Sequence, residues 1–129
     1  AHHNLVTKLL NDRFGIQVRG GCSCAGTYGH HLFQIGYEAS MAILDKMEGG
    51  DAAVKPGWVR LSLHPMMTDA EVDFITHAIS ETVAHMEAWR QDYFFDETTA
   101  EFTHREFADR LEDDVKKWFA EALLVPYDI

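Results

Sequence analysis

The feature that most constrains the fold of this chain is a long amphipathic helix with a clear start. Thr68-Asp69-Ala70-Glu71 is a capping box, in which the threonine hydroxyl and the glutamate carboxylate satisfy each other's open backbone amides. An apolar stripe at helical spacing then runs to about Trp89, and its members are Val72, Ile75, Ile79, Val83 and Met86. A helix of this kind over 68–89 must bury its apolar side against other elements.

The rest of the chain alternates helical and strand patterns. The apolar spacing predicts helices over 4–14, 38–47 and 106–124, and a short helical turn over 30–34. Alternation predicts strands over 16–19 and 58–63, and a small hairpin that pairs 93–95 with 101–103. We therefore expect one α+β domain over 1–129, in which a small antiparallel sheet has helices packed on one face.

Composition excludes several classes of partner. With 129 residues the chain is long enough for one domain with a real core. Its formal charge of −10 argues against nucleic acid and anionic membranes, because both carry phosphates that the surface would repel. No apolar run approaches the roughly 20 residues that span a bilayer, and no signal-peptide pattern opens the chain. We expect a cytoplasmic protein, and two cysteines one residue apart agree with a reducing compartment.

The two cysteines lie in a glycine-flanked loop, Arg19-Gly20-Gly21-Cys22-Ser23-Cys24-Ala25-Gly26. Glycine permits backbone angles and close approaches that other residues resist. A nearby cation such as Arg19 favours a thiolate over a thiol. The loop therefore has the surroundings of a reactive cysteine.

A second fragment carries a candidate for anion binding. Lys55-Pro56-Gly57-Trp58-Val59-Arg60-Leu61-Ser62 ends a turn and begins a strand that contains an arginine. Arginine can hold a carboxylate with two parallel hydrogen bonds. A thiol loop and a carboxylate-binding arginine together indicate a site for an amino acid.

Three blocks of sequence carry a resemblance to one enzyme family. They are Leu9 to Gly26 followed by Tyr28-Gly29-His30, then Pro56 to Ser62, and then Thr68 to Ile75. In this order they resemble the C-terminal small domain of class V aminotransferases, the pyridoxal-phosphate family that includes cysteine desulfurases and selenocysteine lyases. The resemblance covers about residues 3 to 90, and 91–129 is interpreted as a helical extension of a subfamily.

The resemblance implies roles for three residues. Aligned on Arg19, Gly21 and Ala25, the chain has Cys24 where desulfurases of this family carry their nucleophilic cysteine. That thiolate takes sulfur from a cofactor-bound substrate cysteine, so that alanine leaves and an enzyme persulfide forms. Arg60 corresponds to the arginine that binds the substrate carboxylate, and Arg19 supports the thiol loop or binds the same anion. Cys22 has no equivalent role in the family.

The resemblance also implies what this chain does not supply. Pyridoxal phosphate needs a Schiff-base lysine, an acidic partner for its ring nitrogen and a phosphate site. None of the five lysines has a context like that of the family's cofactor lysine. The large cofactor-binding domain is therefore expected in another part of a longer, homodimeric enzyme, and the chain alone is expected to be inactive and free of cofactor.

Two alternatives remain open at this stage. Other class V members, including aminotransferases and lyases, use the same fold without a sulfur-accepting cysteine. The second alternative is a different class of protein, a zinc-binding or interaction module. Two sulfurs and two imidazoles, the ligand set of a structural zinc site, are offered by Cys22, Cys24, His30 and His31. Their spacing is poor for zinc, because structural sites commonly use two well separated ligand pairs.

Overall fold

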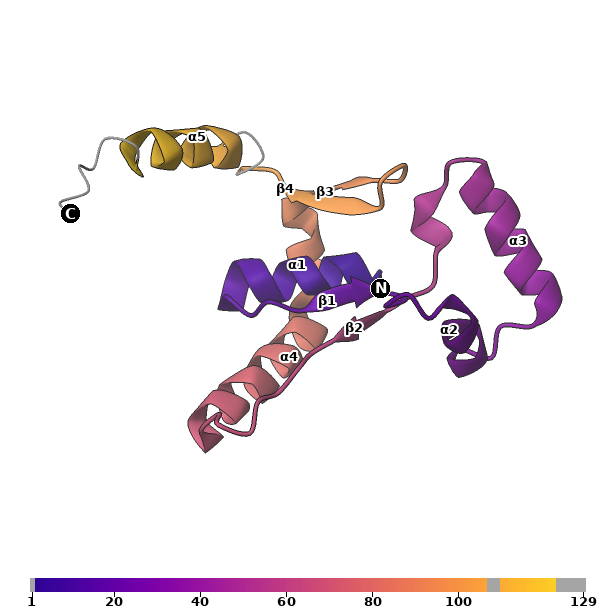
Figure 1. Ribbon diagram of the computed structural model, residues 1–129, viewed down its shortest axis with the longest axis horizontal. Helices are drawn as coiled ribbons and strands as arrows, with labels where there is room; N and C mark the ends of the chain where they lie inside the picture. The colour runs from indigo at the N-terminus through magenta and orange to yellow at the C-terminus, as the bar shows by residue number, and fades with distance from the viewer. Residues whose placement is uncertain (1, 107–109, 123–129) are drawn as a thin grey trace, which may run out of the picture.

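The computed structural model describes residues 2–106 and 110–122 (Figure 1). Within them lie five helices: α1 (His3–Phe14), α2 (Gly26–Leu32), α3 (Tyr37–Glu48), α4 (Asp69–Trp89) and α5 (Arg110–Ala122). The strands are β1 (Arg19–Gly21), β2 (Trp58–Arg60), β3 (Tyr93–Asp96) and β4 (Glu101–His104). Two short 3-10 turns, η1 (Ala52–Val54) and η2 (Arg90–Asp92), precede β2 and β3. The α+β class expected from the sequence is confirmed.

The described strands form two separate antiparallel pairs rather than one sheet. β1 pairs with β2, so that Gly20 lies opposite Val59 and Gly21 opposite Trp58. β3 and β4 form the predicted hairpin, with each strand one residue longer than the sequence pattern indicated. Figure 1 shows α1 between the hairpin and the β1–β2 ribbon, with α4 crossing it.

The first strand begins later than its sequence predicts. We expected a strand over 16–19, but β1 starts only at Arg19. The reason is the end of α1, where Gly15 adopts a left-handed φ of 68° and its amide donates to the carbonyl of Asn11. The amide of Ile16 then donates to the carbonyl of Leu10. This C-terminal cap holds Ile16 by a hydrogen bond to the last turn of the helix. The strand therefore begins only at Arg19.

The hydrophobic core lies between α1 and the β3–β4 hairpin. Leu5 and Leu9 of α1 are buried with Tyr93 and Phe102 of the hairpin. Three partly buried side chains pack around this cluster, namely Met86, Trp89 and Phe95. The apolar spacing predicted a helix over 4–14, and this helix supplies one side of the core.

The buried face of α4 differs from the predicted stripe. Ala78 and Thr82 are the buried residues of this helix, whereas Ile79 is 41% and Val83 67% exposed. Small side chains allow α1 to approach α4 closely, which larger apolar residues would prevent. The Thr82 hydroxyl donates to the carbonyl of Ala78 at 2.8 Å, so its burial leaves no unpaired donor. The predicted stripe is therefore only partly on the packed side, since Met86 packs against the core whereas Ile79 and Val83 are exposed.

Helices α2 and α3 form an arm that extends away from the core (Figure 1). No residue of α3 is buried, and the only buried residue of α2 is Gly29. A side chain at Gly29 would place its Cβ 2.9 Å from the ring of Trp58, so the glycine lets α2 pack against β2. Within residues 2–106 and 110–122 no helix is long and apolar enough to cross a membrane.

Candidate functional site

The thiol loop leaves β1 in an unusual backbone conformation. Ser23 and Cys24 have left-handed φ angles of 51° and 61°, although neither is a glycine. The amide of Ala25 donates to the carbonyl of Cys22 at 2.8 Å, which closes the turn. Consecutive left-handed residues outside glycine store strain, and such strain gathers at binding and catalytic sites. The conformation leaves Cys24 exposed and Cys22 half-buried.

Arg19 contacts the exposed thiol. Its Nη2 lies 3.7 Å from the Sγ of Cys24, within hydrogen-bonding distance for sulfur. Because Arg19 is the first residue of β1 and Cys24 follows the strand, the loop turns back toward its own start. This contact sets a positive charge beside the sulfur to which the family resemblance assigns the role of nucleophile.

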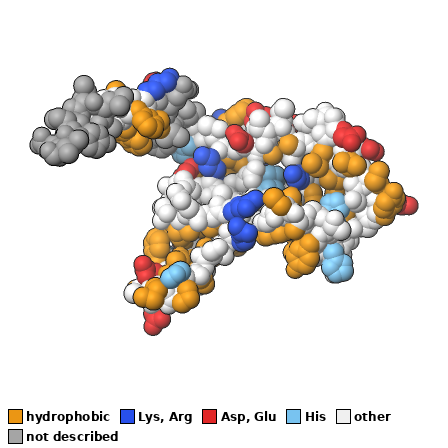
Figure 2. All heavy atoms as spheres, in the orientation of Figure 1, with side chains coloured by type: hydrophobic (Ala, Val, Ile, Leu, Met, Phe, Trp, Pro, Cys, Tyr) orange, Lys and Arg blue, Asp and Glu red, His pale blue; other side chains and the backbone are white. Residues whose placement is uncertain are grey.

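Arg60 lies opposite Arg19 in the β1–β2 ribbon. Directly opposite residues of an antiparallel pair share one face of the ribbon, and like charges in these positions repel. Both arginines are exposed, and Figure 2 shows Lys and Arg side chains gathered over this part of the molecule. A carboxylate bound between the two guanidinium groups would relieve the repulsion. The register thus unites the two arginines singled out in separate sequence fragments.

A cavity of about 560 Å³ opens beside the thiol loop. Its walls come from residues 2–4 at the start of α1, residues 19–24, and side chains of two distant loops, Ala52 with Lys55 and Thr99 with Ala100. Arg19 and both cysteines line it, and Arg60 does not. The structure therefore places the thiol and one arginine in the cavity and the second arginine beside it on the ribbon.

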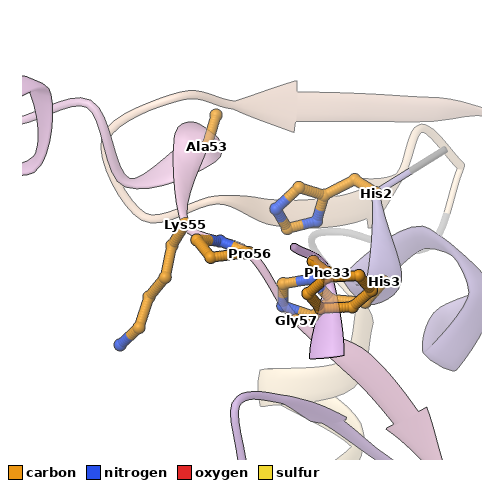
Figure 3. Close-up of a pocket in the computed structure, with 7 residues that line it drawn as sticks. All are labelled: His2, His3, Phe33, Ala53, Lys55, Pro56 and Gly57. Atoms are coloured by element: carbon orange, nitrogen blue, oxygen red, sulfur yellow. The ribbon is translucent and has the colours of Figure 1, made fainter. Parts of the chain in front are cut away.

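A second cavity, of about 260 Å³, adjoins the first through His2, His3 and Lys55 (Figure 3). Its remaining lining residues are Phe33, Ala53, Pro56 and Gly57. Burial lowers the pKa of both histidines below the usual value, so each imidazole is neutral at neutral pH. In Figure 3 the Lys55 side chain extends away from the two rings.

Sequence reasoning assigned no function to these two histidines or to Lys55. Their place at the site depends on β1 pairing with β2, which brings the loop before Trp58 against the start of α1. The one local signal in the sequence was the presence of Gly20, Gly21 and Gly57, because a glycine allows another side chain to pack closely against the backbone. That signal does not say which side chain the partner is.

The zinc alternative finds no ligand set in the structure. Within residues 2–106 and 110–122 no three His, Cys, Asp or Glu side chains are grouped so that they could hold a metal ion. The Nδ1 of His30 instead lies 2.8 Å from the Ser40 hydroxyl and links α2 to α3. His31 is exposed on α2. Among the described residues these four side chains therefore form no common metal site.

The lining of the thiol cavity does not fit pyridoxal phosphate by itself. Lys55 is the lysine that lines it, and no Asp or Glu lines it within the described residues, so an acidic partner for the ring nitrogen is missing. Lys8, Lys46, Lys116 and Lys117 are exposed on helices away from this wall. The described residues offer a thiol and anion-binding groups without a complete cofactor site.

Comparisons of the chain with models of known protein families, with curated proteins and with solved structures found no match.

Proposed function

We propose that this chain supplies the sulfur-accepting thiol and the carboxylate-binding arginines of a pyridoxal-phosphate-dependent amino-acid enzyme of the cysteine desulfurase or selenocysteine lyase type. Cys24 accepts the sulfur or selenium atom, and Arg60, with Arg19, binds the substrate carboxylate. The cofactor belongs to another part of the enzyme, because the thiol cavity has no acidic lining residue in the described part of the chain.

One observation carries the proposal. Arg19 contacts the Cys24 thiol at 3.7 Å and at the same time lies opposite Arg60 in the ribbon. An amino acid with sulfur in its side chain presents a carboxylate and a sulfur atom a few bonds apart. The site has a thiol beside one cation and a second cation opposite the first in the ribbon, which is the chemistry that such a substrate requires.

Sulfur acceptance can be tested on the chain itself with an organic persulfide. The Cys24 sulfur attacks the outer sulfur of the donor R–S–SH, which breaks the donor's S–S bond, forms Cys24–S–SH and releases R–SH. Mass spectrometry of the protein should show a gain of one sulfur atom at Cys24. Cys22→Ser should keep this gain and Cys24→Ser should lose it. Equal labelling of both cysteines would instead make Cys24 an ordinary surface thiol.

Carboxylate recognition can be tested with two donors that differ in one group. Cysteine persulfide carries the carboxylate, and cysteamine persulfide lacks it. The chain should react about tenfold faster with cysteine persulfide, because a charge-assisted contact contributes about 1.5 kcal/mol. Arg60→Ala should remove the preference and Lys46→Ala, an exposed cation on α3, should keep it. An unchanged preference in Arg60→Ala would contradict the assignment and favour a class V aminotransferase or lyase with other contacts.

A further inference from the structure

Three glycines enclose the imidazole ring of His3. A Cβ atom added at Gly57 would lie 2.6 Å from the ring's Cε1, and one added at Gly20 would lie 3.2 Å from its Cδ2. Gly21, which ends β1, is the third, and a Cβ there would lie 4.0 Å from the ring's Nε2. At position 57 the ring occupies the space that a side chain would take, and at position 20 the Thr7 hydroxyl, 2.8 Å from such a Cβ, takes it together with the ring. Its Nε2 lies beside the strand end where the thiol loop begins.

The imidazole of His3 is neutral at neutral pH and can therefore accept a proton. Burial, and then the neighbouring His2 and Lys55, lower its pKa. The titratable and charged groups that line the same cavities are His2 at the N-cap of α1, Lys55 from the loop before β2, and Arg19 with the two cysteines from β1 and its loop. No carboxylate lines either cavity within the described residues. The imidazole therefore has no acidic partner there that would keep it protonated.

The ring of His2, unlike that of His3, makes contacts that stabilise the fold. Its Nδ1 accepts a hydrogen bond from the backbone amide of Asn4 at 3.2 Å and caps α1. The ring also packs on Phe95 and Phe102 of the hairpin, with centroid distances of 5.8 and 6.0 Å. The ring nitrogens of His3 make no hydrogen bond to any residue that the structure describes. The Nε2 of His2 also has no hydrogen-bond partner among the described residues, but it is buried, whereas the Nε2 of His3 lies beside Gly21, where the thiol loop begins. His3 is therefore the better placed of the two for a reacting group.

We propose that His3 is the proton-transfer residue for the reaction of Cys24. The inference rests on the proposed function of the thiol. As the Cys24 sulfur attacks the outer sulfur of a persulfide, its proton passes to the neutral imidazole, and the imidazolium then returns it to the departing thiolate. In the overall reaction, Cys24–SH and R–S–SH give Cys24–S–SH and R–SH. The glycines at 20 and 57 serve to admit the ring beside the thiol loop.

The first test measures the rate at which Cys24 takes sulfur from cysteine persulfide. His3→Ala should lower this rate about a hundredfold at neutral pH, the low end of the effect of a positioned base. Added imidazole should restore the rate, and pyrazole, which has the same shape but is hardly basic, should not. His77→Ala, which removes an exposed histidine of α4, is the matched control and should leave the rate unchanged.

The second test displaces the ring without removing it. Gly57→Ala sets a methyl group 2.6 Å from the imidazole and 2.9 Å from the Cα of Gly21, so it displaces the ring or the strand beside it and should lower the rate as His3→Ala does. Gly26→Ala is its control, because nothing lies within 4 Å of a Cβ at that position. His3→Gln, which keeps a polar side chain of similar size but no basic nitrogen, should also be slow and should lose the dependence of the rate on the titration of His3.

The outcomes separate the two proposals. If the unaltered chain gains no sulfur at Cys24, the proposed function fails and the role of His3 fails with it. If the chain gains sulfur and His3→Gln reacts at the unaltered rate with the same pH profile, only the role of His3 is overturned. A slow His3→Ala variant that imidazole does not restore overturns it as well, because the ring is then needed for packing alone.

Discussion

The helix α1 and the arm formed by α2 and α3 are held in the molecule by very different amounts of buried surface. Leu5 and Leu9 of α1 are 2% and 0% exposed, because the hairpin and α4 close over them. On the arm, Tyr37 is 80% and Leu44 is 44% exposed. Burying a large apolar side chain contributes about 1.5 to 3 kcal/mol, so α1 carries stability that the arm does not.

The difference matters for function because the thiol loop joins the two regions. It leaves β1, which pairs beside α1, and leads directly into α2 of the arm. The cavity walls have the same double origin, with His3 from α1 and Lys55 from the loop that returns from the arm. The left-handed residues Ser23 and Cys24 therefore lie where a well packed region meets a weakly packed one.

The largest expected effect compares a leucine from each region. Leu9→Ala should lower the free energy of unfolding by about 2 to 5 kcal/mol, because it opens a cavity in the only continuous core of the described residues. Leu44→Ala should change it by less than about 0.5 kcal/mol, since the side chain is already half exposed. Urea unfolding measures both values. Similar losses in the two variants would show that the arm is covered in solution.

A smaller effect concerns the polar edge of the core. The Tyr93 hydroxyl donates to the Asp12 carboxylate at 2.9 Å and ties the hairpin to α1. Tyr93→Phe should cost about 1 kcal/mol of unfolding free energy, since the hydrogen bond is lost while Asp12 keeps contact with water.

The same tyrosine predicts a pH dependence. Burial, and then the bond to Asp12, raise the pKa of Tyr93 well above its usual value near 10. Below pH 10 the hydroxyl is protonated in both the folded and unfolded chain, so its contribution to stability is complete. Above pH 10 only the unfolded chain loses the proton, so stability falls as pH rises. Unfolding curves between pH 8 and 11 should show this fall in the unaltered chain, and a weaker one in Tyr93→Phe.

Sequence patterns predicted the elements of this fold better than their packing. The capping box at Thr68, the end of the first helix at Phe14 and the hairpin after Trp89 depend on neighbours in the chain, and all three are present. The exposed Val83 shows the limit, because the side of α4 that packs is decided by α1, which lies more than fifty residues earlier. Periodicity does not contain that information.

In the candidate site, too, contacts between near neighbours in the chain were predictable from the sequence and contacts between distant segments were not. Cys24 and Arg19 are five residues apart, and their proximity follows from a glycine-flanked turn that the sequence shows. The register that sets Arg60 opposite Arg19 depends on how two strands pair across nearly forty residues. The approach of His3 to Gly57 depends on the same pairing, so it could be found only from the structure.

The smallest effect tests whether the exposed start of α4 behaves like the arm. Thr68 accepts from the amide of Glu71, and its own amide and hydroxyl donate to the Glu71 carboxylate at 2.7 and 2.9 Å. Thr68→Ala should cost about 0.5 kcal/mol of helix stability, the low end for the loss of an N-cap. Because this end lies outside the core, the loss should appear as faster amide exchange in the first turn of α4, while exchange in α1 stays unchanged.

The Glu71 carboxylate reports on the same cap independently. The hydrogen bonds from Thr68, the backbone amide's before the hydroxyl's, lower the pKa of Glu71. A carboxylate whose pKa is lowered by folding stabilises the fold above its unfolded pKa, and the contribution is lost as pH falls through the folded value. In Thr68→Ala the hydroxyl's bond is removed, so the pKa of Glu71 should rise toward its usual range in an NMR titration. An unmoved pKa would show that the backbone amide alone holds the carboxylate, and the first turn of α4 should then keep its amide protection.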